Sequence, residues 1–122
     1  MSKRILSVSY DRSLLATRKM LIESTGHQVT NALGFGQAKT HCVAGGFDLF
    51  ILGHSIPKKD KLELIKLFRA NCPAPILSLE RNGEDFVPCD FHVSADDPEK
   101  FVQVVDNILA GDKLGVPRKY NV

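Results

Sequence analysis

The sequence is poor in cysteine, has almost no net charge and contains no long apolar run. Its three cysteines in 122 residues are odd in number and widely spaced, which argues against a disulfide framework and is typical of reduced cytosolic thiols. A formal net charge of +2 gives no general attraction to nucleic acid or to an anionic membrane. No stretch approaches the roughly 20 apolar residues of a membrane span. The apolar start of the chain breaks at Ser7 and Ser9, too early for a signal peptide. We therefore expect a cytoplasmic protein without a membrane or nucleic-acid partner.

The chain is long enough for one domain with a sizeable core. Its 122 residues are 43% hydrophobic and 25% charged, which is the composition of an ordinary globular domain. Residues 112–122 are basic and rich in turn formers. We predict one domain over residues 1–111, followed by a flexible basic C-terminal tail over 112–122.

Predicted strands and helices alternate along the chain. The strands share apolar or alternating sequences and fall at 4–9, 27–33, 47–52, 75–79 and 91–94. The helices fall at about 12–25, 37–44, 61–71 and 98–110. The second is weak, and each of the others has one apolar stripe. Asp11 or Ser13 is expected to cap the first helix, and Asp60 and Asp97 are expected to cap the third and fourth. Because such alternation suits right-handed crossovers, we predict a three-layer α/β sandwich with a five-stranded parallel sheet.

The predicted sheet is organised around residues 47–57, FDLFILGHSIP. The first six residues form an unbroken apolar run, which is typical of a central parallel strand that helices cover on both faces. In open α/β sheets, ligands and reacting groups lie just past the carboxyl ends of such strands. The residues at that point are Gly53 and His54, so the candidate site begins with a residue that has no side chain.

Four stretches, RILSVSYD, FDLFILGHSIP, PAPILSLE and DFHVSADDPEKF, make residues 3–110 resemble the receiver domain of bacterial two-component response regulators. The resemblance implies a flavodoxin-like sheet with strand order 2-1-3-4-5. Only eleven residues separate Leu79 from Phe91, where the family normally has a whole helix. We therefore expect helix four of the family to be shortened or missing, which would reshape a face that many receivers use for dimerisation and switching.

Every signature position of the receiver acceptor pocket differs in this chain. The resemblance implies two acids after the first strand, an acceptor aspartate after the third, a threonine or serine after the fourth and a lysine after the fifth. The matching positions are Ser9 and Tyr10 with Asp11 one place later, then Gly53, Glu80 and Ser94. Glycine supplies no nucleophilic oxygen, magnesium loses its carboxylate ligands, and a glutamate would repel an incoming phosphoryl group. We expect a pseudo-receiver with no catalytic residue, metal or cofactor, which the usual aspartate and magnesium route does not phosphorylate.

Two functions stay open. The first is a stand-alone, non-enzymatic module that docks onto a signalling protein such as a histidine kinase or another regulator, with a homodimer also allowed. Its surface would be the loops past the strand ends: Tyr10, His54, Ser55, Ile56, Pro57, Glu80 and Arg81. The alternative is a small-molecule sensor or an enzyme that reuses the vacated cleft. An interaction module predicts a cleft plugged by side chains such as Tyr10 and Glu80, whereas a sensor predicts an open pocket with converging polar groups.

Several residues have both a functional and a plain interpretation. His54 is either a phosphoacceptor or base near the old pocket, or an exposed loop residue. Tyr10 either fills the vacated acidic site or faces solvent. Cys42 next to His41 lacks zinc-like spacing, so a structural thiol is the better interpretation. The run 58–61, KKDK, is typical of a solvated helix start, with contact to an acidic partner as the alternative. DNA binding has little support because no helix-turn-helix follows and the basic tail is short.

Overall fold

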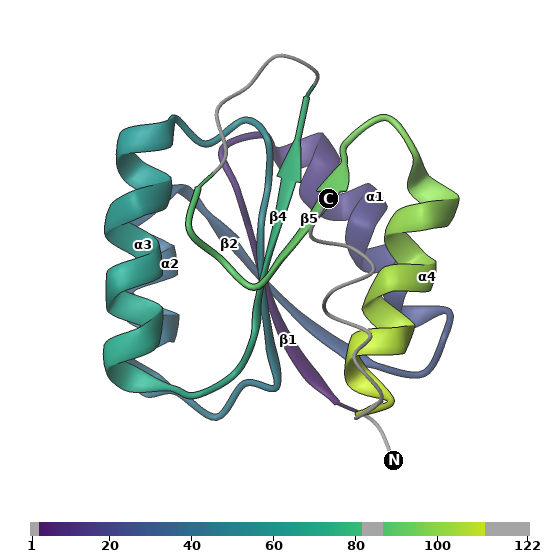
Figure 1. The fold of residues 1–122 in the computed structure, drawn as a ribbon, viewed down its shortest axis with the longest axis horizontal. Helices are drawn as coiled ribbons and strands as arrows, with labels where there is room; N and C mark the ends of the chain where they lie inside the picture. Colours follow the sequence, from purple (N-terminus) through teal and green to yellow (C-terminus); the bar gives the residue numbers. More distant parts are fainter. Residues whose placement is uncertain (1–2, 82–86, 112–122) are drawn as a thin grey trace.

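A computed structural model describes residues 3–81 and 87–111 of the chain. The elements are β1 (Arg4–Ser9), α1 (Arg12–Glu23), β2 (Gln28–Leu33), α2 (Gly34–Ala44), β3 (Leu49–Leu52), α3 (Lys58–Asn71), β4 (Ile76–Glu80), β5 (Phe91–Ser94) and α4 (Pro98–Leu109). All strand pairs are parallel, in the order β2-β1-β3-β4-β5. Figure 1 shows α2 and α3 on one face of the sheet and α1 and α4 on the other. The predicted three-layer, flavodoxin-like architecture and its strand order are confirmed.

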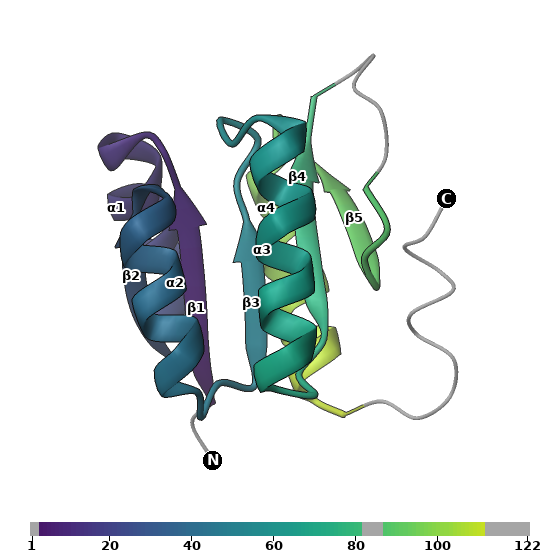
Figure 2. The ribbon, with the colours of Figure 1, turned by 90° about the vertical axis from the view of Figure 1, so that its left-hand side faces the viewer.

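The central strands are apolar because helices cover both of their faces. All of β3 is buried, and so is all of β1 after Arg4. Alternate side chains enter two cores. Phe50 packs on the α3 side, where its ring stacks 4.1 Å from that of Phe68, while Leu49 and Ile51 pack on the side of α4. Figure 2 shows β2 and β5 at the two edges of the sheet. The strands between them, β1, β3 and β4, therefore have a neighbouring strand on each side.

Helix α2 and strand β3 begin away from their predicted starts. Helix α2 begins at Gly34 rather than at 37, because the Gln37 side chain accepts a hydrogen bond from the backbone N–H of Leu33 at 2.8 Å. This bond satisfies a donor at a helix start that has no short polar cap. Strand β3 begins only at Leu49. Just before it, the Asp48 carboxylate accepts the backbone N–H of Arg4 at 2.9 Å, so a side chain replaces the backbone acceptor of the ladder.

Two of the three predicted aspartate caps are confirmed, and the third is wrong. Asp11 and Asp97 each accept the backbone N–H three residues further on, at 3.1 and 3.0 Å. Asp60 does not cap α3, which begins earlier, at Lys58, without a side-chain cap. The Asp60 carboxylate instead accepts a hydrogen bond from the Tyr10 phenol at 2.7 Å, so it serves a contact between α3 and the loop after β1.

Residues 81–90 connect β4 to β5. The described part of this connection, residues 81 and 87–90, contains no helix. Val87 returns to the core, and the Asp90 carboxylate accepts the backbone N–H of Ile76 at 2.8 Å. The prediction that helix four is shortened or missing therefore holds over the described part. Residues 82–86 and the predicted tail, 112–122, lie outside the described residues. Within the described ranges, no helix is long and apolar enough to span a membrane.

Candidate functional site

The carboxyl ends of the strands meet at one edge of the sheet, and the predicted pocket positions lie there. Ser9, Glu80 and Ser94 end β1, β4 and β5. Gly53 follows β3, and its backbone N–H donates to the Val8 carbonyl at 2.9 Å. This bond extends the ladder between β1 and β3 by one residue. A Cβ added at Gly53 would lie 3.3 Å from the Ser9 Cβ, so the structure brings the ends of the two central strands into contact.

The space beside Gly53 is filled by the guanidinium of Arg18. This side chain comes from the middle of α1 and is only 6% exposed. A Cβ added at Gly53 would lie 2.6 Å from Arg18 Nη1, so the two cannot occupy the place together without movement. Arg18 Nη2 donates to Nδ1 of His54 at 3.2 Å. Because arginine has no acceptor atom, this bond requires the imidazole proton to be on Nε2.

The Arg18 guanidinium is a buried cation beside Gly53. Its Nη1 is buried and has no hydrogen-bond partner. Among the described residues, no carboxylate lies within ion-pair distance of it. Burial lowers the pKa of Arg18, and the more distant Asp11 carboxylate partly offsets that effect. Since the guanidinium remains protonated in proteins, the candidate pocket contains a positive charge.

Serine hydroxyls join the loop after β1 to the loop after β3. Ser9 Oγ lies 2.9 Å from Ser55 Oγ, and Ser55 Oγ accepts the backbone N–H of Tyr10 at 3.0 Å. Ser9 Oγ also accepts the backbone N–H of Asp11 at 3.0 Å. The Asp11 carboxylate is the cap of α1. The Asp11 carboxylate is therefore engaged with the helix start.

Tyr10 is half-buried, and its side chain reaches from the loop after β1 to α3. It therefore neither fully fills the vacated acidic site nor fully faces solvent, the two interpretations that the sequence allowed. Its phenol donates to Asp60 at 2.7 Å. Burial and the Asp60 carboxylate raise the pKa of Tyr10 above its ordinary range. Both causes disfavour the phenolate. Tyr10 therefore closes the side of the pocket toward α3, while Arg18 fills the position beside Gly53.

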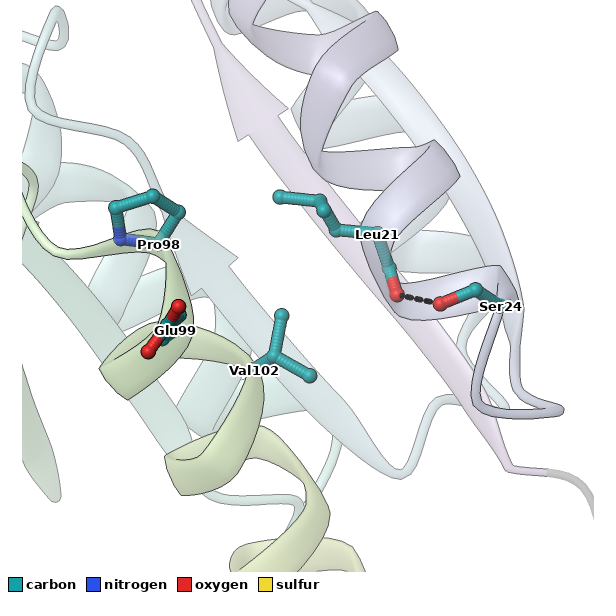
Figure 3. Close-up of a pocket in the computed structure, with 5 residues that line it drawn as sticks. All are labelled: Leu21, Ser24, Pro98, Glu99 and Val102. Atoms are coloured by element: carbon teal, nitrogen blue, oxygen red, sulfur yellow. Dashed lines mark hydrogen bonds between the residues drawn. The ribbon is translucent and has the colours of Figure 1, made fainter.

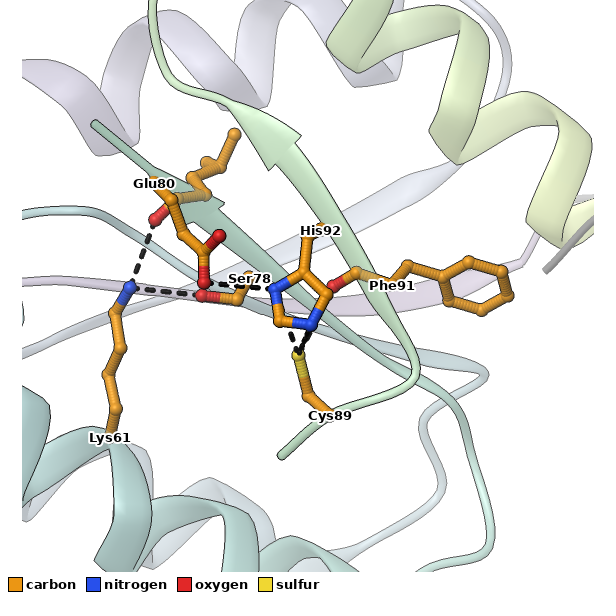
Figure 4. Close-up of polar contacts among 7 residues, drawn as sticks. Lys61, Ser78, Glu80, Cys89, Phe91 and His92 are labelled. Atoms are coloured by element: carbon orange, nitrogen blue, oxygen red, sulfur yellow. Dashed lines mark hydrogen bonds and ion pairs between the residues drawn. The ribbon is translucent and has the colours of Figure 1, made fainter. Parts of the chain in front are cut away.

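Lys61 is buried at the carboxyl end of β4, although the KKDK run predicted a solvated residue. Its side chain is 3% exposed, and Nζ donates to Ser78 Oγ and to the Leu79 carbonyl, both at 3.0 Å (Figure 4). The prediction is wrong because α3 begins before Lys61. The first-turn position turns this side chain toward the sheet, where β4 offers two acceptors. The strand ends therefore receive a lysine from α3. The residue at the end of β5, where the resemblance implies a lysine, is the uncharged Ser94.

The Glu80 carboxylate is hydrogen-bonded to His92 on β5. His92 Nδ1 lies 2.9 Å from Glu80 Oε2, and both side chains are largely buried. The parallel register places Ser78 beside His92 and Glu80 beside Ser94, so Glu80 and His92 are diagonal neighbours on one face. The prediction that Glu80 plugs the pocket or joins the exposed surface is wrong, because Glu80 is buried and its carboxylate is hydrogen-bonded to His92.

Cys89 lies next to this pair, with its sulfur 3.7 Å from His92 Nε2 and 3.1 Å from the Phe91 carbonyl (Figure 4). Burial raises the pKa of Cys89 to about 11, and the Glu80 and Asp90 carboxylates add to the effect. A thiol with such a pKa is a poor nucleophile at neutral pH. The arrangement of Glu80, His92 and Cys89 therefore lacks the activated sulfur that a cysteine hydrolase requires.

Alkylation of Cys89 by iodoacetamide is expected to be slow at pH 8. A pKa near 11 in place of the ordinary 9.0 leaves about 100-fold less thiolate than in an ordinary thiol. The rate is expected to rise tenfold per pH unit up to about pH 11. Peptide mapping by mass spectrometry at pH 8 and 10, with the urea-unfolded chain as the control, measures it. Equal rates for the folded and unfolded chain at pH 8 would contradict the burial of this sulfur.

The predicted interaction residues differ in exposure. His54 and Ser55 are half-buried, and Pro57 and Arg81 are exposed. Ile56 is 2% exposed and packs in the core on the side of α2 and α3, so its predicted place on the surface is wrong. The apolar side chain turns inward as the loop returns toward α3. Across residues 3–81 and 87–111, no group of three His, Cys, Asp or Glu side chains could hold a metal ion.

The sequence did not predict the buried cations Arg18 and Lys61 as site residues, nor Asp60, Cys89 and His92, which bind predicted site residues or one another. Arg18 recurs with Leu15 and Ile22 on the buried face of α1. A charge in the middle of an apolar stripe was the available signal, since charged residues are rarely fully buried without a specific role. Lys61 gave no such signal, because it stands in a run of charged residues.

A shallow groove lies between α1 and α4, on the face of the sheet opposite to α2 and α3. It has a volume of about 460 Å³ and is lined by Leu21, Ser24, Pro98, Glu99 and Val102. Figure 3 shows Leu21 and Val102 pointing into the space between the two helices, with Pro98 at the start of α4. The groove contains no group that extends the polar network at the strand ends.

No protein-family model and no curated protein matches this chain. Solved structures do match. A response regulator receiver domain from Methylobacillus flagellatus is 19% identical, with a TM-score of 0.76, over 88% of this chain and 99% of that one. The N-terminal domain of a response regulator/sensory box/GGDEF three-domain protein from Carboxydothermus hydrogenoformans is 18% identical, with a TM-score of 0.78, over 93% of this chain and 99% of that one.

A third match is a chain in the crystal structure of the histidine kinase ThkA in complex with the response regulator protein TrrA. It is 23% identical, with a TM-score of 0.74, over 88% of this chain and 98% of that one. TM-scores of 0.74 to 0.78 establish a shared fold, and identities of 18 to 23% establish nothing beyond it. The chain therefore has the fold of response regulator receiver domains, and the expected strand order and layer arrangement agree with these matches.

Proposed function

We propose that this chain is a pseudo-receiver, a non-enzymatic module of two-component-type signalling in the cytoplasm. It binds another signalling protein and is not phosphorylated through an aspartate and magnesium. The observation that carries this proposal is the Arg18 guanidinium, which fills the space beside Gly53. In a receiver-like sheet, this is the position after the third strand where a reacting group would be placed.

Phosphoryl transfer to a carboxylate needs an acceptor oxygen and a bound cation, and the geometry opposes both. Gly53 supplies no oxygen. Magnesium binds through carboxylate and water oxygens, whereas the group beside Gly53 is a guanidinium, which repels a cation. Ser9 is bonded to Ser55, and the Asp11 carboxylate caps α1. The filled position also favours the interaction module over a sensor or an enzyme that reuses the cleft, since those functions expect open space here.

The partner that fits this proposal is a signalling protein such as a histidine kinase or another regulator. One of the solved structures with this fold comes from a complex with a histidine kinase. The surface available for docking at the strand ends comprises the half-buried His54 and Ser55 and the exposed Pro57 and Arg81. Hydrogen bonds from the loop after β1 hold Ser55 in place, and Arg18 holds His54.

A capture experiment with charge-reversed variants tests the proposal. Tagged wild type, Arg81→Glu and Lys39→Glu are incubated with native cytoplasm, and the retained proteins are identified by mass spectrometry. Lys39 is an exposed control on α2. We expect one signalling protein to be retained by wild type and by Lys39→Glu and to be lost with Arg81→Glu. Equal retention by all three proteins, or retention of no signalling protein, would count against docking at the strand ends.

A further inference from the structure

The Arg18 guanidinium is fixed on one side and unsatisfied on the other. Nη2 is bonded to His54, while the buried Nη1 has no partner. The one acid whose charge acts on Arg18 is Asp11, and its carboxylate is engaged in the helix cap. The cation therefore has a donor available and no anion in contact with it among the described residues.

Such an arrangement lowers stability compared with an apolar side chain of the same length. A buried charge loses its hydration, and a buried N–H without an acceptor costs about 1 to 3 kcal/mol. The neighbours Leu15 and Ile22 on the same face of α1 are buried and apolar, so the position would accept an apolar residue. Local features that cost stability without a structural return are characteristic of functional sites.

We propose that Arg18 is the receptor for a single oxyanion, which pairs with Nη1 at the carboxyl ends of β1 and β3. The chemistry is that of a carboxylate or phosphate oxygen, which a guanidinium binds with strong, charge-assisted hydrogen bonds. This inference rests on the proposed function: the source is an acidic side chain of the docked protein, for which acetate is the probe, while phosphate tests a free inorganic anion. Arg18 Nη2 is held by His54, which is half-buried in the loop after β3, so this loop borders the guanidinium. The pocket then has the opposite polarity to a magnesium-binding one.

Titration of the full chain with sodium acetate and, separately, with inorganic phosphate tests this proposal. The ionic strength is held constant with sodium chloride, and the Nε–H resonance of each arginine is followed by NMR. We expect the Arg18 signal to shift with saturation and a dissociation constant on the order of 1 to 10 mM. The signal of Arg12, which is exposed on the same helix, is the internal control and is expected to drift without saturation.

Variants assign the response to the side chain. Arg12→Met is expected to keep the saturable change in backbone resonances around residues 53–55, and Arg18→Met is expected to lose it. Saturation with acetate identifies a carboxylate as the ligand class, and saturation with phosphate alone identifies a phosphate. If neither probe saturates the Arg18 signal of the wild-type chain, the guanidinium is only a filler and the proposal is overturned. This result is independent of the capture experiment, which depends on the outer loops.

Discussion

Replacing Gly53 by aspartate gives the chain a carboxylate after β3 but no ability to take a phosphoryl group from acetyl phosphate and magnesium. The new Cβ would meet Arg18 Nη1 at 2.6 Å, so the carboxylate pairs with the guanidinium instead of binding a metal ion. Magnesium would still lack a second acid, because the Asp11 carboxylate caps α1. The intact mass of Gly53→Asp is therefore expected to stay unchanged.

Two controls accompany this experiment. A receiver domain with a complete acidic pocket, in the same mixture, shows that the reagent is active. Gly53→Ala separates chemistry from strain, because any Cβ here would also lie 3.1 Å from the Val8 carbonyl oxygen. Both variants are expected to lose about 1 to 3 kcal/mol of stability through this crowding. A mass gain by Gly53→Asp that hydroxylamine removes would mean that Arg18 does not prevent the new carboxylate from accepting a phosphoryl group.

The two buried cations are expected to respond to methionine in opposite ways. Lys61 donates to Ser78 and to the Leu79 carbonyl, so Lys61→Met strands two buried acceptors and costs about 2 to 3 kcal/mol. Arg18 Nη1 has no partner. Because replacing a poorly compensated buried charge by an apolar group is often neutral or stabilising by about 1 to 4 kcal/mol, Arg18→Met is expected to unfold no earlier than wild type.

Urea unfolding monitored by circular dichroism measures both changes. Lys66→Met is the matched control, since Lys66 is an exposed lysine on the same helix, and it is expected to shift the free energy of unfolding by less than about 0.5 kcal/mol. If Arg18→Met were as destabilising as Lys61→Met, the Arg18 guanidinium would have to make stabilising contacts, in contradiction to its unpartnered Nη1.

The order of elements and two helix starts could be predicted because they depend on local signals. Apolar runs, an aspartate before a helix and a proline at its first position act over a few residues. The glycine after β3 could also be located, because the strand before it is an unbroken apolar run. These features place the candidate site on the sheet without any knowledge of tertiary contacts.

The contents of the site could not be predicted, because they depend on which elements face one another. Lys61 is in a charged run, and only the position of α3 over β4 turns it inward. Glu80 and His92 meet only through the register of β4 and β5. Arg18 gave a partial signal as a charge on an apolar stripe, but its approach to Gly53 follows from the packing of α1 against the ends of β1 and β3.

The absence of an acyl phosphate on the wild-type chain is the central claim, and intact-mass spectrometry tests it most directly. The chain is incubated with acetyl phosphate and magnesium beside a receiver domain that has all its acids. We predict that the reference domain gains one phosphoryl group while the mass of this chain stays the same. A gain of one phosphoryl group by this chain that hydroxylamine then removes would contradict the account.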